Sequence, residues 1–161
     1  MTNNDILRRF RYALDISNAT MIEIFSLAGG KVDQPSLLDL LKREEEVGYR
    51  ECDATLMEQF LDGLIVLKRG RQEIAVGRPP QAVTELNNND ILRKLRIALE
   101  YREEDMIATM HAADVTISKS ELSALFRARG HKNYKECGDQ FLRNFLKGLT
   151  IRTRNINPEE G

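Results

Sequence analysis

The chain has 161 residues, 42% hydrophobic and 30% charged, which is an ordinary composition for a globular protein. Its formal net charge of -1 argues against a protein that binds polyanions over its whole surface. The sequence has 2 cysteines and neither a CxxC motif nor a Cys/His cluster, so it predicts no disulfide framework, metal site or other cofactor. It begins without an apolar signal region and contains no apolar run near the roughly 18 residues that span a bilayer. We therefore expect a cytoplasmic protein with no membrane partner.

A stretch of about 68 residues occurs twice in this chain, offset by about 85 positions without a gap, and about 22 of the aligned pairs are identical. Each copy reads as four short amphipathic helices. The fold class is therefore predicted to be all-α, with two tandem pseudo-symmetric four-helix repeats. The expected organisation is repeat one at 3–70, a linker at 71–87, repeat two at 88–155 and a frayed tail at 156–161.

The first helix of each repeat opens on an Asn-Asp sequence, which favours helix capping. Its predicted buried face consists of Ile6, Leu7, Phe10, Ala13 and Leu14, repeated as Ile91, Leu92, Leu95, Ala98 and Leu99. Asn18 is the expected cap of the second helix in repeat one. The side chains expected inward on that helix are Met21, Ile22, Phe25 and Ala28, repeated as Met106, Ile107, Met110 and Ala113.

The third helix has the clearest start signal, a capping box from Ser118 to Glu121 with a hydrophobic staple between Ile117 and Leu122. In repeat one Asp33 replaces the serine as the expected cap. The buried stripe is predicted to consist of Leu37, Leu40 and Leu41, and of Leu122, Leu125 and Phe126.

The fourth helix is expected at about 53–68 and again from residue 138 or 139 to about 152. Its apolar stripe is predicted from Leu56, Phe60, Leu61 and Leu64, repeated as Phe141, Phe145, Leu146 and Leu149. Gly63 and Gly148 fall in the middle of this helix, where glycine costs about 1 kcal/mol relative to alanine. This repeated cost predicts that another helix approaches closely at that point.

The linker at 71–87 contains Gly77 and the pair Pro79-Pro80. Its 17 or so residues span up to about 55 Å when fully extended. That reach allows the repeats either to pack within one chain or to exchange between two chains, so a homodimer is possible.

The two repeats differ in charge. Repeat one has about 9 basic against 12 acidic residues, whereas repeat two has about 13 against 9. A basic surface is predicted in repeat two on the loop before the fourth helix and on that helix, extended by Arg152 and Arg154 at the helix end. Its candidate partner- or phosphate-binding residues are Arg127, Arg129, His131, Lys132, Lys135, Arg143 and Lys147, with Tyr134 as a neighbouring aromatic face. Repeat one has Glu44, Glu45 and Glu46 near the equivalent place, so the potential is reversed there. The alternative explanation for this charge difference is neutral sequence drift at solvent-exposed positions, where charge contributes little to the fold.

The tetrad Tyr49-Arg50-Glu51-Cys52 returns as Tyr134-Lys135-Glu136-Cys137. A thiol just before a helix has its thiolate favoured by the helix dipole, so a reactive cysteine is conceivable. Catalysis would also require a base, and repeat one contains no histidine. The competing interpretation is that Cys packs as a small apolar residue, Tyr covers the junction between the third and fourth helices, and Glu satisfies backbone donors.

Arg8 and Arg93 lie on the polar side of the first helix without an obvious local acidic partner. They are candidates for contact with the other repeat or with an anion. The sequence contains no nucleotide-binding or nucleophile-elbow motif, and no catalytic residue is expected.

Several stretches resemble the YehS-like family of small bacterial proteins, which contain two tandem copies of a helical domain of unknown function. The matching stretches are 4–8, 60–64, 68–70, 88–89 and, most specifically, 131–143. The resemblance covers nearly the whole chain apart from the linker and tail and implies a bacterial cytosolic protein with two repeats. It implies no activity, ligand or catalytic residue.

Three functional hypotheses follow. The leading one is a non-enzymatic binding or regulatory protein that contacts a protein partner through the basic surface of repeat two. The second is RNA or DNA binding through the same surface. The third is an enzyme that uses Cys137 or a cleft between the repeats, and it has the least support.

Overall fold

The computed structural model describes residues 1–70 and 86–154. These residues form eight helices and no strands, so the protein is all-α, as predicted. The chain divides into two compact units, Met1–Leu86 and Asn87–Gly161. The predicted tail at 156–161 and most of the predicted linker, 71–85, lie outside the described residues, and Asn87 is the cap residue before the first helix of the second unit.

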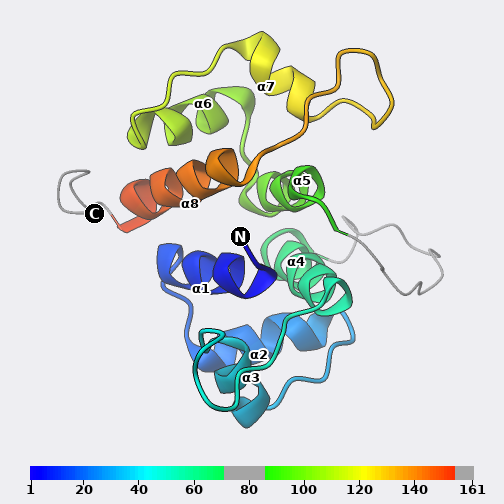
Figure 1. Cartoon of the computed structure of the whole chain (residues 1–161), viewed down its shortest axis with the longest axis vertical. Helices are drawn as coiled ribbons and strands as arrows, with labels where there is room; N and C mark the ends of the chain where they lie inside the picture. The colour runs from blue at the N-terminus through cyan, green and yellow to red at the C-terminus, as the bar shows by residue number, and fades with distance from the viewer. Residues whose placement is uncertain (71–85, 155–161) are drawn as a thin grey trace. The chain divides into compact units, whose positions relative to one another are not determined.

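The first unit contains α1 (Asn3–Ala13), α2 (Asn18–Leu27), α3 (Gln34–Leu40) and α4 (Ala54–Arg69). Helix α2 packs along α4, while α3 contacts α2 and α1 contacts α4 (Figure 1). The core lies where these amphipathic faces meet. Its largest buried side chains include Phe10, Phe25 and Phe60. The ring centroid of Phe60 lies 6.0 Å from that of Phe10 and 5.4 Å from that of Phe25.

The second unit repeats this arrangement with α5 (Asn88–Leu99), α6 (Glu103–Ala112), α7 (Lys119–Leu125) and α8 (Asp139–Arg154). Helix α6 packs along α8, α7 contacts α6, and α5 contacts α8 (Figure 1). Phe145 occupies the position of Phe60, and both are fully buried, as the shared stripe predicts.

Helix α1 begins with a capping box between Thr2 and Asp5, and α5 with the same arrangement between Asn87 and Asp90. The predicted caps Asp33 and Ser118 are confirmed for α3 and α7. The prediction of Asn18 as a cap is wrong. The hydroxyl of Ser17, one residue earlier, accepts the Thr20 N–H at 3.2 Å, and Asn18 is the first helical residue.

Part of the predicted core is displaced by one or two positions. Ile24 and Thr109 are buried where Ile22 and Ile107 were expected to be, and Met57 and Leu142 replace Leu56 and Phe141. Leu14, Leu99, Leu41, Phe126, Ala28 and Ala113 are only half-buried. The remaining core predictions are confirmed. These shifts occur because the position of the opposing helix decides which side chains are buried. The apolar pattern of one helix does not give that position.

Gly63 and Gly148 mark the closest approach of the paired helices, as predicted. A Cβ placed on Gly63 would lie 1.7 Å from the carbonyl oxygen of Ile24, and one on Gly148 would lie 1.9 Å from that of Thr109. No side chain fits at such distances, so glycine is required for α2 to lie against α4 and for α6 to lie against α8.

Candidate binding surface

A buried asparagine, Asn4 in the first unit and Asn89 in the second, holds the segment that leads into the last helix of that unit. Asn4 Nδ2 donates to the carbonyl oxygens of Leu40, at 2.9 Å, and Arg50, at 2.8 Å. Its Oδ1 accepts the Cys52 N–H at 2.9 Å and the Tyr49 hydroxyl at 3.0 Å. The side chain thus ties the start of α1 to the end of α3 and to the segment before α4.

Asn89 makes the equivalent bonds in the second unit. Its Nδ2 donates to Leu125 and Lys135 carbonyl oxygens at 3.0 and 2.9 Å, and its Oδ1 accepts the Cys137 N–H at 2.8 Å. The preceding residues add one bond each, from Asn3 to the Cys52 carbonyl and from Asn88 to the Cys137 carbonyl. The repeated Asn-Asn and Tyr-X-Glu-Cys motifs therefore contact each other. This role of the asparagines was not predicted from the sequence, although both motifs recur in the two repeats.

The glutamates of the repeated tetrads, Glu51 and Glu136, were expected to accept backbone N–H groups, but the asparagines do so instead. Asn4 and Asn89 accept the cysteine N–H groups, whereas Glu51 and Glu136 are exposed, so that part of the interpretation is wrong. The cysteines themselves pack as small apolar side chains, at 1% and 6% exposure. Burial raises the pKa of both thiols to about 12, which removes the thiolate that a nucleophile would need.

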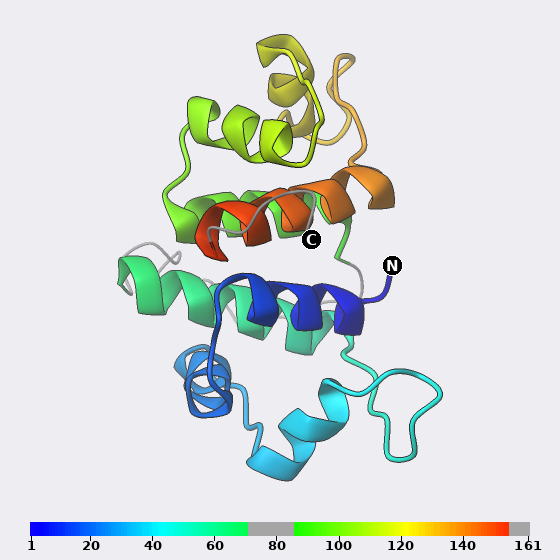
Figure 2. The same ribbon diagram turned by 90° about the vertical axis from the view of Figure 1, so that its left-hand side faces the viewer.

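The segment between the third and fourth helices forms a projecting loop in each unit. We call residues 127–135 the basic loop and residues 43–49 the acidic loop. The loop between α7 and α8 extends away from the helices in Figure 1, and the one between α3 and α4 does so in Figure 2. In each unit the buried asparagine binds one group shortly before the loop and one at its end, so the same anchor presents two different exteriors.

The basic loop is held by its own hydrogen bonds. The Lys135 N–H donates to the Ala124 carbonyl oxygen at 3.0 Å, and Arg127 Nη1 donates to the Asn133 carbonyl oxygen at 3.2 Å. His131 Nδ1 accepts the Asn133 N–H at 3.1 Å. These bonds leave Arg129, Lys132 and the imidazole Nε2 of His131 without a hydrogen-bond partner among residues 86–154, and all three side chains are exposed.

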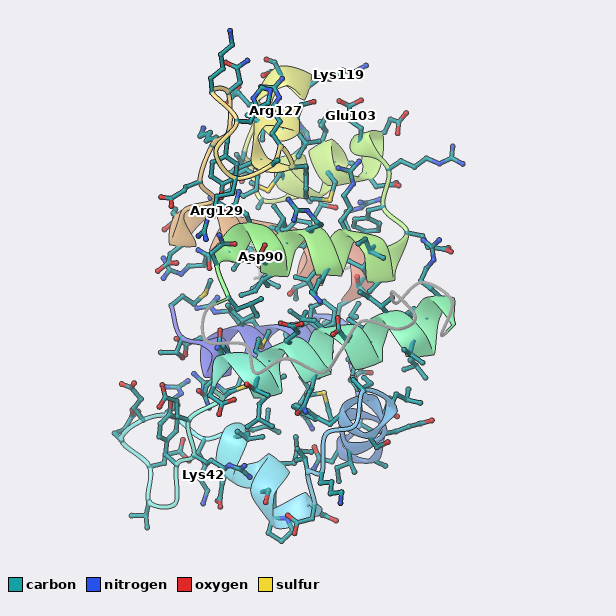
Figure 3. All side chains as sticks on the ribbon, turned by 90° about the vertical axis from the view of Figure 1, so that its right-hand side faces the viewer. Lys42, Asp90, Glu103, Lys119, Arg127 and Arg129 are labelled. Atoms are coloured by element: carbon teal, nitrogen blue, oxygen red, sulfur yellow. The ribbon has the colours of Figure 1, made fainter. Side chains whose placement is uncertain are left out.

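Figure 3 shows Arg127 beside α7 and Arg129 further toward the start of α8. Arg143 and Lys147 lie one turn apart on α8 itself. Arg143 Nη1 donates to Gln140 Oε1 at 2.9 Å, and Lys147 is exposed. No hydrogen bond within residues 86–154 joins either side chain to the basic loop. The predicted residues of the loop thus share one hydrogen-bonded segment, and the two on α8 form a separate pair one turn apart.

Tyr134, predicted to be a neighbouring aromatic face, is half-buried. Its hydroxyl oxygen is buried with no hydrogen-bond partner. Arg152 is also engaged rather than free. Its Nη1 donates to the Asp105 carbonyl oxygen at 2.9 Å and to Thr109 Oγ1 at 2.7 Å, and its guanidinium lies 5.3 Å from the Tyr101 ring centroid. It links α8 to α6 instead of extending the basic surface.

Arg8 and Arg93 do have local acidic partners, contrary to expectation. Arg8 bonds to Asp5 one turn earlier and donates to the Lys42 carbonyl oxygen at 2.8 Å. Arg93 lies 3.8 Å from Asp90. Partial burial opposes ionisation of Asp5, but hydrogen bonds from Thr2 and the nearby Arg8 and Arg9 charges outweigh it and lower its pKa. The pairing weakens both arginines as anion sites, and the missed signal was the i,i+3 spacing.

The described residues contain no cluster of His, Cys, Asp and Glu suited to a metal ion. Among the helices that the structure describes, none is long and apolar enough to span a bilayer.

Comparison with known sequences supports the tandem architecture. A family model described as "Protein of unknown function (DUF1456)" matches residues 3–70 and again residues 88–155. This chain belongs to that family. It is also 40% identical over 152 residues to the "Uncharacterized protein YehS" of Escherichia coli strain K12, covering 94% of this chain and 96% of that protein. No solved structure matches the chain. The resemblance to YehS-like proteins is thereby confirmed.

Proposed function

We propose that this chain is a non-enzymatic binding protein whose basic loop, with Arg143 and Lys147, contacts an acidic segment of a protein partner. The observation that carries the proposal is the charge reversal between equivalent positions of two copies of one scaffold. Arg129 and His131 stand where repeat one has Glu44 and Glu46, and Arg143 and Lys147 stand where it has Glu58 and Asp62. Because equivalent asparagines hold both loops, the repeats differ here in the charge of their exposed side chains.

The internal hydrogen bonds of the basic loop support a binding role. A loop already held in one conformation loses less entropy on binding than a free one. The exposed cations of Arg129 and Lys132 would steer an acidic partner toward the loop at low salt. A nucleic acid would use the same cations, but single-stranded binding also draws on several exposed aromatic faces, and the basic loop has one tyrosine, Tyr134, which is half-buried. That contrast favours a protein partner.

The buried thiols support the non-enzymatic part of the proposal. With a pKa near 12, Cys137 stays protonated at neutral pH, and the described residues place no imidazole in hydrogen-bond contact with it. An acyl or alkyl transfer through this sulfur would lack both its thiolate and its base.

The test is titration with a labelled poly-glutamate peptide and, in parallel, with mixed-sequence RNA and DNA oligonucleotides across a range of salt concentrations. Arg129→Glu is the test variant, and Lys119→Glu is the matched control, because Lys119 is exposed on α7 of the same unit. We expect Arg129→Glu to weaken poly-glutamate binding at least about threefold at low salt, while the control changes little. Equal weakening by both variants would mean that only net charge matters. Tighter binding to the oligonucleotides would favour the nucleic-acid alternative.

A further inference from the structure

The acidic loop of repeat one is as well formed as the basic loop. Lys42 Nζ donates to the Val47 carbonyl oxygen at 2.9 Å, and the Tyr49 N–H donates to the Glu46 carbonyl oxygen at 3.2 Å. Gly48 takes a positive φ of 89°, which permits the tight turn after Val47. The loop therefore has a defined surface.

That surface combines negative charge with an apolar tip. Glu44, Glu45 and Glu46 are all exposed, and Val47 beside them is 94% exposed. A single exposed apolar residue is common on protein surfaces. Here it stands at the end of an ordered acidic loop, where an opposing surface would cover it together with the carboxylates.

The same chain contains a surface of opposite charge at the equivalent place. The basic loop presents Arg129, His131 and Lys132, and it is fixed by Asn89 as the acidic loop is fixed by Asn4. We propose that the acidic loop of one chain docks on the basic loop of a second copy of this chain. This inference rests on the proposed function and deepens it, because it names the partner of the basic loop.

The contact is heterologous, since it joins two different surfaces of the same protein. Each pair of chains then has a second acidic loop and a second basic loop available, so the contact either closes a ring or continues into a longer assembly. Exposed ion pairs are individually weak and are screened by salt. The association is expected at high protein concentration and low ionic strength, and closure through two contacts would strengthen it.

A mixing experiment tests the inference on the full chain. Glu44→Lys/Glu45→Lys gives a chain with two basic loops. Arg129→Glu/Lys132→Glu gives one whose residues 127–135 have no net charge, because Arg127 and Lys135 balance the two new glutamates. Sedimentation velocity up to about 0.5 mM protein should show association of the wild type that declines with salt. Each variant alone should remain monomeric, and an equimolar mixture should associate again. Val47→Ser should weaken wild-type association without any change in charge.

The control variants carry the same changes in net charge at exposed positions outside the two loops. Glu23→Lys/Glu104→Lys matches the acidic-loop variant, and Lys31→Glu/Lys119→Glu matches the basic-loop variant. These controls should associate as the wild type does. A wild type that stays monomeric at every concentration, or a mixture of variants that does not associate, would overturn the inference.

Poly-glutamate titration separates this failure from failure of the proposed function. A monomeric wild type that still binds the peptide through Arg129 would retain the binding role and eliminate the second copy as partner. Loss of both readouts would eliminate both proposals.

Discussion

Asn4 and Asn89 make nearly the same hydrogen bonds, while the loops that they anchor carry opposite charges. In repeat one the loop presents three glutamates and Val47, whereas in repeat two it presents Arg129, His131 and Lys132. A buried polar side chain must keep its partners or leave several groups unsatisfied, but an exposed charge changes at little cost to stability. The comparison therefore separates what the fold requires from what is free to acquire a function.

The two repeats also close their central helix pairs differently. Repeat two uses the guanidinium of Arg152 on α8 to bind Asp105 and Thr109 on α6. Repeat one has Leu67, Thr20 and Ile24 at these positions, and Leu67 is 40% exposed. The glycine contact beside this feature is the same in both, so the closest approach is preserved while its periphery varies.

The largest expected effect is at the glycine contacts. Gly63→Leu or Gly148→Leu should destabilise its own unit by about 4 kcal/mol, because a side chain at either position would collide with the backbone of the facing helix. Thermal unfolding measured by circular dichroism checks this. Gly138→Ala is the control, because nothing lies within 4 Å of a Cβ added there. Unchanged stability in both leucine variants would contradict the observed helix packing.

The buried asparagines should be the next most sensitive. Asn89→Ala removes three hydrogen bonds and leaves buried backbone groups unpaired, so we expect a loss of about 3 kcal/mol in the free energy of unfolding. Asn4→Ala should cost at least as much. Denaturant unfolding of each variant measures the loss, and Asn144→Ala on the polar side of α8 should cost much less. A loss below that of Asn144→Ala would show that the anchor is dispensable.

The buried thiols predict an alkaline loss of stability. Below pH 9, the ordinary pKa of a thiol, both states are protonated and the stabilisation is complete. Above it the unfolded chain ionises first, so stability falls as the pH rises toward the folded pKa of about 12. At pH 10 the loss should be about 1.4 kcal/mol per thiol. Denaturant unfolding at pH 7.5 and pH 10 should show a smaller difference in Cys52→Ala/Cys137→Ala than in the wild type. An equal difference would argue against burial.

The smallest predicted effect compares the two tyrosines. The Tyr49 hydroxyl donates to Asn4, so Tyr49→Phe should cost about 1 kcal/mol. The Tyr134 hydroxyl is buried without a partner, so Tyr134→Phe should be neutral or slightly stabilising. Denaturant unfolding of the two single variants gives the comparison. The same loss in both would mean that the hydroxyls have equivalent environments.

The sequence predicted the architecture because the repetition and the helical period determine which residues are buried. It predicted Asp33, Ser118, Phe60 and the two mid-helix glycines correctly, since caps, stripes and breakers are local signals. The asparagine anchor was beyond such signals, because its partners lie 36 to 48 residues away. The same limit explains why Ile24 was missed, since its burial depends on the opposing helix.

The candidate surface was predicted only in part, for a related reason. Composition identifies Arg127, Arg129, Lys132 and Arg152 equally as cations, but their availability depends on tertiary contacts. Arg127 partly holds the loop and Arg152 holds a helix pair, whereas Arg129 and Lys132 face solvent.

The central claim is that the two loops are held by equivalent asparagines and that only the charge of its exposed side chains makes the loop of repeat two a binding surface for acidic partners. Exchanging the charges tests it: Glu44→Arg/Glu46→His/Val47→Lys in repeat one together with Arg129→Glu/His131→Glu/Lys132→Val in repeat two, which leaves composition unchanged. Backbone amide shifts on titration with poly-glutamate report which loop binds. We predict that the perturbed amides move from residues 127–135 to residues 43–49. Binding that stays at residues 127–135 would contradict the claim.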